Sequence, residues 1–214
     1  LPQGEIIGII GNNGAGKSTF ARCLCGLDKR ALGELELNGH SYRAKQRCHI
    51  SYMVMQDVNH QLFTEDVLDE LLLSMDGEDE KENTEWANQI LSSLDLAAKI
   101  KLHPMSLSGG EKQRVAIGSA IASNKEILVF DEPTSGLDYF HMVEVSDNLN
   151  RLKDMGKSLF LITHDPELIY KCCTYLLFIQ ENKVLWHRPM DDEAIKLLRA
   201  FFSHEKGADI TNAS

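Results

Sequence analysis

Residues 11 to 19 decide the fold, and they read Gly11-Asn-Asn-Gly-Ala-Gly-Lys-Ser-Thr19. An apolar run, Glu5-Ile-Ile-Gly-Ile-Ile10, precedes them, and a stretch with helical spacing follows. A strand, a glycine-rich loop and a helix in this order are typical of a phosphate-binding P-loop. Because glycine tolerates positive φ, the backbone N–H groups of such a loop can turn inward around phosphate oxygens. An ordinary glycine-rich turn is the alternative, and the flanking strand and helix count against it.

Two side chains of the loop add chemistry to this backbone cradle. Lys17 would place a positive charge near the β and γ phosphates, and Ser18 offers a hydroxyl to Mg²⁺. The positive end of the helix that starts here completes the anion site. The candidate phosphate-binding residues are Asn12, Asn13, Gly14, Ala15, Gly16, Lys17, Ser18 and Thr19.

Composition limits the class of protein. The 214 residues suffice for one large domain or two small ones, and the content of 43% hydrophobic and 25% charged residues is ordinary for a soluble globular chain. No apolar run approaches the roughly 20 residues of a membrane-spanning helix, so membrane association would go through a partner. A formal net charge of −10 without a basic block argues against nucleic acid as the main ligand.

The cysteines and the first residue give two further expectations. The five cysteines are odd in number and lack paired metal spacing, which favours core thiols in a reducing cytosol. They are Cys23, Cys25, Cys48, Cys172 and Cys173. The sequence starts at Leu1 rather than at methionine and shows no signal peptide, so we expect it to be cut from something longer.

The first half of the chain changes from strand-like to helical pattern. Residues 33–39 alternate and end in Asn-Gly, which predicts a short strand and a tight turn, and the strand-like run 49–55 delivers Gln56. From 64 to 102 the spacing predicts helices, interrupted at 75–83 by an acidic, solvated stretch. The apolar stripes are Val67, Leu68, Leu71 and Leu72, and Trp86, Ile90, Leu91 and Leu94. We expect this segment to be a helical insert on an α/β core.

The second half returns to alternating elements. Buried strands are predicted at 126–130 and 157–163, with a helix between them and polar residues at the strand ends. This pattern is typical of a parallel sheet whose site lies at its carboxyl edge. Two shorter strands are expected at 175–180 and 183–187, then an amphipathic helix over about 192–202 and a disordered polar tail.

Two motifs outside the loop carry further chemistry. Asp131 and Glu132 follow four apolar residues, so Asp131 would hold Mg²⁺ and Glu132 would polarise an attacking water, although such a pair can also be a helix cap. In the string Leu107-Ser-Gly-Gly-Glu-Lys-Gln-Arg114, Ser108 and Glu111 have capping-box spacing. The helix end that this spacing predicts could bind a second phosphate.

The string 107–114, taken with Gly11–Thr19, Asp131-Glu132 and Ser135-Gly-Leu-Asp138, resembles the nucleotide-binding cassettes of ABC transporters over essentially the whole chain. The resemblance implies an α/β fold: a P-loop NTPase core whose parallel sheet is flanked by helices, plus an inserted α-helical subdomain that carries the signature motif. The core would span about 1–60 and 124–214, and the helical subdomain about 61–123.

The resemblance also implies roles for single residues. ATP would contact the Walker A residues above, the Q-loop glutamine Gln56, the signature residues Ser108, Gly109 and Gly110, and Asp138 of the D-loop. The implied Mg²⁺ ligands are Ser18, Gln56 and Asp131. Glu132 would be the general base, and His164 would be the switch histidine that contacts the γ-phosphate. A lone histidine after an apolar strand is usually a polar cap, but the flanking Thr163 and Asp165-Pro166 match the family pattern.

In this family two cassettes pair head to tail, so that ATP on one Walker A loop meets the signature motif of the other. The implied partners are therefore a second cassette, homologous or fused, and a transmembrane coupling subunit, with no nucleic acid. The implied activity is Mg²⁺-dependent ATP hydrolysis at the cytoplasmic face of the cell membrane.

The stretch from Gln56 to Glu70 is similar to the Q-loop region of energy-coupling factor importers, which take up vitamins or metal ions. Family members also carry two strands and an adenine-stacking aromatic residue before the segment that matches Pro2-Gln-Gly-Glu5. Only sixteen residues precede Lys17 here, and that aromatic is missing. We therefore expect one cassette of a tandem protein, truncated at its N-terminus.

Three other classes of protein fit the sequence less well. A soluble ABC ATPase acting in translation would have a long charged helical linker and a more basic composition. Neither feature appears in these residues. An SMC-type repair ATPase would insert a coiled coil, whereas only about 90 residues without sustained heptads separate Lys17 from Ser108. A degenerate cassette would bind nucleotide only to regulate its partner, and the presence of Lys17, Asp131, Glu132 and His164 argues against it.

Overall fold

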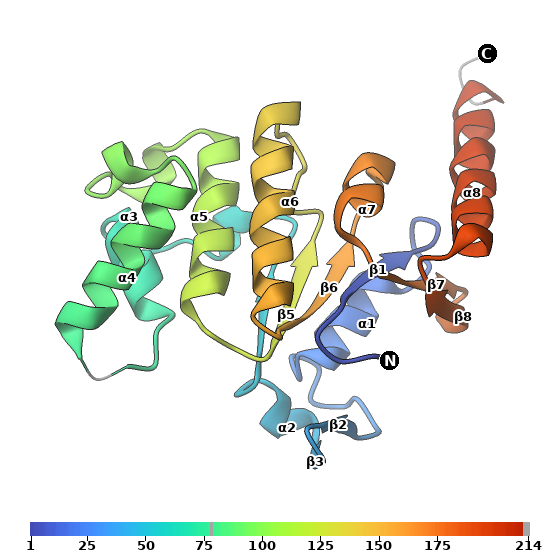
Figure 1. The fold of residues 1–214 in the computed structure, drawn as a ribbon, viewed down its shortest axis with the longest axis horizontal. Coiled ribbons are helices and arrows are strands. Elements are labelled where there is room, and N and C mark those ends of the chain that lie inside the picture. Colours follow the sequence, from blue (N-terminus) through green and yellow to red (C-terminus); the bar gives the residue numbers. More distant parts are fainter. Residues whose placement is uncertain (78, 212–214) are drawn as a thin grey trace.

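The computed structural model describes residues 1–77 and 79–211, apart from the side chains of 204–211. A six-stranded sheet in the order β4-β5-β6-β1-β7-β8 forms its centre (Figure 1). The strands are β1 (Ile6–Ile10), β4 (Ser51–Val54), β5 (Ile127–Asp131), β6 (Ser158–Ile162), β7 (Tyr175–Gln180) and β8 (Lys183–Pro189). Neighbouring strands are parallel except for β7 and β8. The predicted parallel sheet is confirmed, with one antiparallel strand added at its edge.

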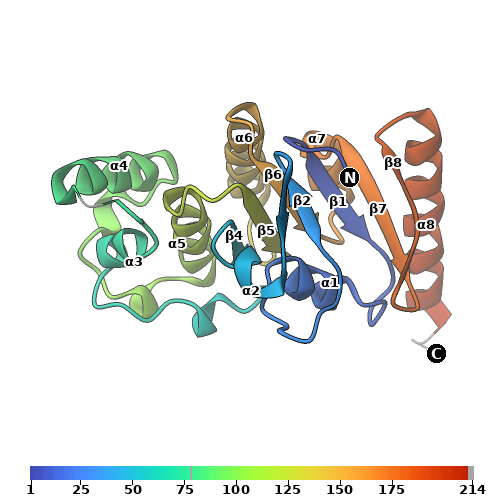
Figure 2. The same ribbon diagram turned by 90° about the horizontal axis from the view of Figure 1, so that it is seen from below.

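Helices cover both faces of this sheet. Figure 2 shows α6 and α7 on one face and α1 on the other, and Figure 1 shows the hairpin β2–β3 next to α2. The helices are α1 (Lys17–Leu24), α2 (Ala44–Arg47), α3 (Val67–Leu73), α4 (Glu80–Ser93), α5 (Gly109–Ala122), α6 (Tyr139–Asp154), α7 (Pro166–Cys172) and α8 (Asp192–Thr211). The hairpin is β2 (Leu35–Leu37) and β3 (His40–Tyr42), and the 3₁₀ turns are η1 (Val58–His60), η2 (Ala97–Lys99) and η3 (Pro104–Ser106).

The central strand β1 explains why the sheet is buried on both sides. Ile6 and Ile10 point into the hydrophobic core shared with α6 and α7, whereas Ile7 and Ile9 point into the core shared with α1. All four are at most 2% exposed. Burying each isoleucine contributes about 1.5–3 kcal/mol. Because β1 is apolar on both faces, it is stable where helices cover both sides of the sheet.

The segment between β4 and β5 forms the expected group of helices. Helices α3, α4 and α5 contact one another, and α5 also contacts β4. Leu71, Leu91 and Leu94 are fully buried there, and a Cβ on Gly118 of α5 would lie 3.2 Å from Leu94. Two expected stripe positions differ from this pattern: Leu72 is half-buried and Trp86 is 40% exposed.

Trp86 is exposed because of where it lies along α4. It lines an open cavity together with Met75, Lys125 and Ala122, the last residue of α5. A large indole is seldom covered completely at such a position.

The end of the chain corrects one expectation. The polar tail that was predicted to be disordered after about residue 202 continues α8 as far as Thr211. No proline follows Pro189, so the sequence holds no strong helix breaker in this stretch. Residues 212–214 lie outside the described residues. No helix in the described part of the chain combines the length and the apolar composition needed to span a bilayer.

Candidate functional site

The glycine-rich loop joins β1 to α1 at the carboxyl edge of the sheet. Gly16 precedes α1 in a left-handed conformation with φ of 100°, and no side chain caps the helix. A Cβ on Gly16 would come within 2.6 Å of Asn182, and one on Gly11 within 2.0 Å of the Ile179 carbonyl oxygen. Only glycine fits both positions, and the first N–H groups of α1 remain available to an anion.

Lys17 lies across the mouth of this loop. Its side chain is on the first turn of α1, the residue is 8% exposed, and Nζ donates to the carbonyl oxygens of Gly11 at 2.6 Å and Asn12 at 3.1 Å. These two bonds hold the ammonium group over the backbone cradle, so a positive charge faces the space enclosed by the loop.

Asp131 ends β5 beside the same loop and is 6% exposed. Burial raises the pKa of its carboxyl group, while a hydrogen bond with Ser18 and the charge of Lys17 act in the opposite direction. The carboxylate of Asp131 and the hydroxyl of Ser18 therefore form a pair of adjacent oxygen groups next to Lys17.

Glu132 follows Asp131 and turns away from the strand. Its φ of 52° lies in the left-handed region, while its backbone N–H still donates to the Ile162 carbonyl oxygen at 2.8 Å. Oε1 lies 3.7 Å from Nε2 of His164, and Oε2 accepts from the His164 backbone N–H at 3.4 Å. Burial raises the pKa of Glu132, and His164 opposes this shift.

These groups line one cleft of about 470 Å³. Of the residues predicted from the sequence, the cleft is lined by Asn13, Gly14, Ala15, Gly16, Lys17, Ser18, Thr19, Gln56, Asp131, Glu132 and His164. Ser135, Ile162 and Asn182 line it as well and were not predicted. Asn12 faces the site through its carbonyl oxygen, which accepts from Lys17.

Asn182 was missed because its partner lies far away in sequence. It sits in the turn between β7 and β8 with φ of 60°, and its backbone N–H donates to Ala15 in the loop at 2.9 Å. Asparagine tolerates a left-handed backbone, so Asn182 is a usable turn signal. That the turn meets the loop follows only from the pairing of β7 with β1.

The oxygen groups of the cleft fit Mg²⁺ that is shared with a bound ligand. Mg²⁺ prefers oxygen ligands and is usually held by one or two side chains plus substrate phosphates. Ser18, Asp131 and the side-chain amide of Gln56 are such groups on the lining of the cleft. Within the described residues, no group of three or more His, Cys, Asp or Glu side chains could hold a metal ion. In a site of this kind the bound ligand would supply the remaining coordination.

The other predicted residues do not line this cleft. Ser108 caps α5: its Oγ accepts from the Glu111 N–H at 3.3 Å, and Glu111 Oε2 accepts from the Ser108 N–H at 2.8 Å. A Cβ on Gly109 would meet nothing within 4 Å, so this end of α5 is open. Asp138 caps α6 and is bonded to His141, whose backbone N–H holds the pKa of Asp138 below its usual value.

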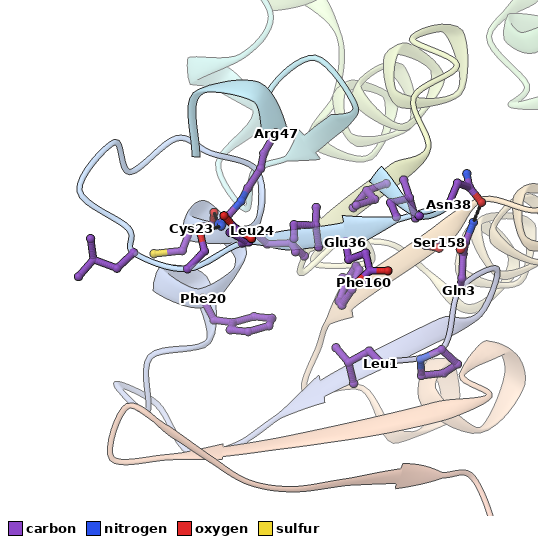
Figure 3. A pocket seen from close by; sticks show the side chains of 18 residues that line it. Leu1, Gln3, Phe20, Cys23, Leu24, Glu36, Asn38, Arg47, Ser158 and Phe160 are labelled. Carbon is purple, nitrogen blue, oxygen red and sulfur yellow. Dashed lines mark hydrogen bonds between the residues drawn. The ribbon is translucent and has the colours of Figure 1, made fainter. Parts of the chain in front are cut away.

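A second cavity, of about 770 Å³, lies between α1, the β2–β3 hairpin and the main sheet (Figure 3). Phe20, Leu24 and Phe160 line it, and the Arg47 guanidinium group is bonded to the backbone carbonyl groups of Cys23 and Gly33. It has more space than the cleft, but its lining contains no combination of lysine, paired carboxylates and histidine. The candidate catalytic groups therefore line the smaller cleft and not this cavity.

Comparisons with known proteins agree with this geometry. The model of the ABC transporter family matches residues 1–135. A Treponema denticola protein named as an ABC transporter ATP-binding protein is 45% identical over 183 residues, which are 85% of this chain and 36% of the relative. The methionine import ATP-binding protein MetN of Bacillus subtilis is 36% identical over 196 residues, covering 86% of this chain and 57% of MetN.

Solved structures share the fold. CbiO1 of Clostridium perfringens, part of the ABC transporter complex CbiONQ, superposes with a TM-score of 0.79 at 23% identity and covers 92% of this chain and 82% of its own. The dimeric cassette MJ0796 bound to ADP and Pi gives a TM-score of 0.78 at 25% identity, covering 89% of this chain and 88% of its own.

The chain spans about a third of the length of the Treponema and Methanosarcina relatives that it matches, between 32% and 36%. The family match nevertheless covers more than half of the chain and includes the glycine-rich loop and the Asp131-Glu132 pair. The chain therefore belongs to the ABC transporter family, as an ATP-binding cassette.

Proposed function

We propose that this cassette binds ATP with Mg²⁺ and hydrolyses it, and that it is an ATPase unit of a membrane importer. The observation that carries the proposal is the cleft, which brings a lysine, a backbone cradle, a buried and a half-buried carboxylate, a glutamine and a histidine to one edge of the sheet. Phosphoryl transfer from a nucleoside triphosphate needs this set of groups for positioning and for charge stabilisation.

Each group has a separate task. The loop N–H groups and Lys17 bind the β and γ phosphates, while Ser18, Asp131 and Gln56 hold the metal. When bound, magnesium neutralises the charge that develops on the phosphate oxygens. Glu132 takes a proton from the attacking water, and its raised pKa makes it a stronger base than an exposed glutamate. His164 contacts the γ-phosphate, and it also keeps the Glu132 carboxylate oriented through the contacts at 3.7 and 3.4 Å.

The position of the signature end supports pairing with a second cassette. Ser108, Gly109 and Gly110 do not line the cleft of their own chain, yet they form a helix N-terminus that is open at Gly109 and could meet an anion. A head-to-tail partner, homologous or fused, would bring its signature end and Asp138 to the ATP bound here. We assign residues 61–123 to the helical subdomain and 1–60 with 124–214 to the nucleotide-binding core.

The finer assignment is to an energy-coupling factor type importer of a vitamin or metal ion. It rests on the likeness of residues 56–70 to the Q-loop region of those importers, and the similarity to relatives named as import proteins is in line with it. In this proposal Gln56 reports nucleotide occupancy to a transmembrane coupling subunit at the cytoplasmic face of the membrane.

The test is Glu132→Gln, assayed for ATP hydrolysis and for ATP-dependent dimers over a range of protein concentrations. Hydrolysis should fall by about 100-fold or more, the usual size of a lost general base, while dimers persist because the shape of the side chain is kept. Glu126→Gln is the matched control, since Glu126 precedes the opposite end of β5 and pairs with Lys157 at 3.4 Å. Loss of nucleotide binding and of dimers in Glu132→Gln would contradict the assigned role.

A further inference from the structure

The loop that connects Gln56 to α3 is held in place by side chains that the proposed chemistry does not use. Gln56 lines the cleft, but its side chain is exposed and makes no hydrogen bond within the described part of the chain. Its position at the cleft must therefore come from the backbone of the preceding residues, at the end of β4. Whatever fixes that backbone also fixes Gln56.

The backbone before Gln56 lies on the edge of the sheet. β4 pairs with β5 on one side and is the last strand in the order of the sheet. The carbonyl oxygen of Met53 and the N–H of Met55 point toward the open side, where no strand pairs with them. Unpaired groups of this kind are normally left to water or covered by another part of the chain.

The side-chain amide of Gln61 covers both of these groups. Nε2 donates to the Met53 carbonyl oxygen at 3.0 Å, and Oε1 accepts from the Met55 N–H at 3.2 Å. In a parallel pair, a residue bonds in this way to the residues before and after the one it faces. The Gln61 amide thus takes the place of a strand residue opposite Val54 and extends the ladder of β4 by one bridge.

The remaining bonds anchor Gln61 itself. Its second N–H donates to the Tyr52 hydroxyl at 3.1 Å, so every donor and acceptor of the amide has a partner. The neighbouring side chains of Val58 and Leu62 are 6% and 3% exposed and tie the loop to the core. Farther along, the buried Glu70 carboxylate accepts from the N–H groups of Phe63 at 3.0 Å and Thr64 at 3.1 Å.

We propose that Gln61 is a positioning residue for Gln56: its amide completes the edge of β4 and thereby holds Gln56 at the magnesium side of the cleft. The inference rests on the proposed function, since Gln56 needs a position only if it meets a nucleotide and its metal. Both halves of the amide are required. Glutamate keeps the acceptor for Met55 but faces the Met53 carbonyl with a second oxygen, and methionine removes both bonds at similar size.

The experiment compares Gln61→Met and Gln61→Glu with Gln89→Met, a change of the same type on the exposed side of α4. The first readout is amide hydrogen exchange at Met55 without nucleotide, which should speed up by about tenfold or more in both Gln61 variants because the N–H partner is lost or displaced. The second is the affinity for ATP without Mg²⁺, which depends on the loop 11–19 and should stay within about twofold of wild type.

The third readout is the Mg²⁺ dependence of ATP hydrolysis. In the Gln61 variants the midpoint should rise by about three- to tenfold and kcat should fall, as in Gln56→Ala, and the double variant should be no worse than Gln56→Ala because both act through one contact. A purely structural role would lower thermal stability without shifting the Mg²⁺ midpoint. If Gln61→Met does not fold, Gln61→Glu, which changes one NH₂ to oxygen, provides the same three readouts.

Two failures are distinguishable. A wild-type protein that binds no nucleotide would overturn the proposed function and this assignment with it. A wild-type protein that hydrolyses ATP, with Gln61 variants that match Gln89→Met in Met55 exchange and in Mg²⁺ dependence, would overturn the assignment of Gln61 alone.

Discussion

Two helices of this cassette begin at glycine-rich sequences, and their N-termini differ in what satisfies them. α1 has Gly16 at its N-cap and no capping side chain, and Lys17 and Asp131 stand next to it. α5 closes part of its own end, because Ser108 and Glu111 satisfy each other's backbone N–H groups at 3.3 and 2.8 Å. The N-terminus of α1 is part of the cleft. The N-terminus of α5 lies outside the cleft, and in the proposed function it meets ATP that is bound to a second cassette.

The largest expected effect is at the first of these ends. Lys17→Met should lower the affinity for ATP with Mg²⁺ by about 100-fold or more, since each charge-assisted hydrogen bond contributes about 1.5–3 kcal/mol. Calorimetry measures the affinity, and Lys29→Met, on an exposed residue just after α1, is the control. Equal affinities of Lys17→Met and Lys29→Met for ATP would mean that Lys17 does not bind phosphate, and the N-terminus of α1 would then lose its distinction from that of α5.

The second prediction concerns the capping of α5. Ser108→Ala removes the acceptor for the Glu111 N–H and should cost about 1 kcal/mol, which lowers Tm by about 2–4 °C in a chain of this size. The affinity of the single chain for ATP should not change. The rate of ATP hydrolysis at protein concentrations at which two cassettes pair should fall. Ser106→Ala, which loses only a bond to His103, is the control. A drop in the intrinsic ATP affinity would show that α5 contributes to the cleft of its own chain.

The third prediction uses the buried carboxyl group of Asp131 beside α1. Burial raises the pKa of Asp131 in the folded chain, so above its ordinary value near 3.8 the folded state holds the proton more tightly than the unfolded state. The stability gained from this proton is present at low pH and is lost as pH rises through the folded-state pKa. Asp131→Asn should therefore melt at a higher temperature than wild type at pH 7.

The difference in melting temperature between Asp131→Asn and wild type should shrink as pH falls toward 4, because the wild-type carboxyl is then also neutral. Glu111, at the α5 end, provides the opposite case. The Ser108 backbone N–H lowers its pKa, so Glu111→Gln should be less stable than wild type at pH 7. The same sign for both variants would contradict the contrast between the two helix ends.

The smallest effect is expected at the contact between α5 and the loop that follows Gln56. Lys112 on α5 donates to Asn59 in the loop after Gln56 at 2.9 Å, on the exposed surface. Lys112→Met should change stability by less than about 1 kcal/mol and hydrolysis by no more than about threefold, since exposed polar contacts are weak. Adding Asn59→Ala should change neither value further. A larger loss would mean that this contact, and not only the sheet edge, couples the cleft to α5.

Much of the cleft could be predicted because its residues lie at the ends of strongly patterned elements. The apolar runs before Gly11, Asp131 and His164 predict buried strands, and parallel strands bring their carboxyl ends to one edge. Asn182 and Gln61 could not be predicted in the same way. The bonds of Asn182 depend on a strand pairing, and those of Gln61 on a free sheet edge, and neither leaves a local pattern. Trp86 follows the helical spacing, but it borders an open cavity that no local pattern indicates.

By itself, the sequence determined the glycine-rich loop, the strand and helix on either side of it, the capping box at Ser108 and the carboxylate pair at the end of β5. These features rest on φ preferences, side-chain periodicity and hydrogen bonds between residues at most a few positions apart. The tertiary structure alone decided that Lys17, Asp131 and His164 share one cleft, that Ser108 lies outside it, and that Gln61 covers the edge of β4. Those outcomes depend on strand order, and contacts between distant strands are set by packing of the whole core rather than by any single segment.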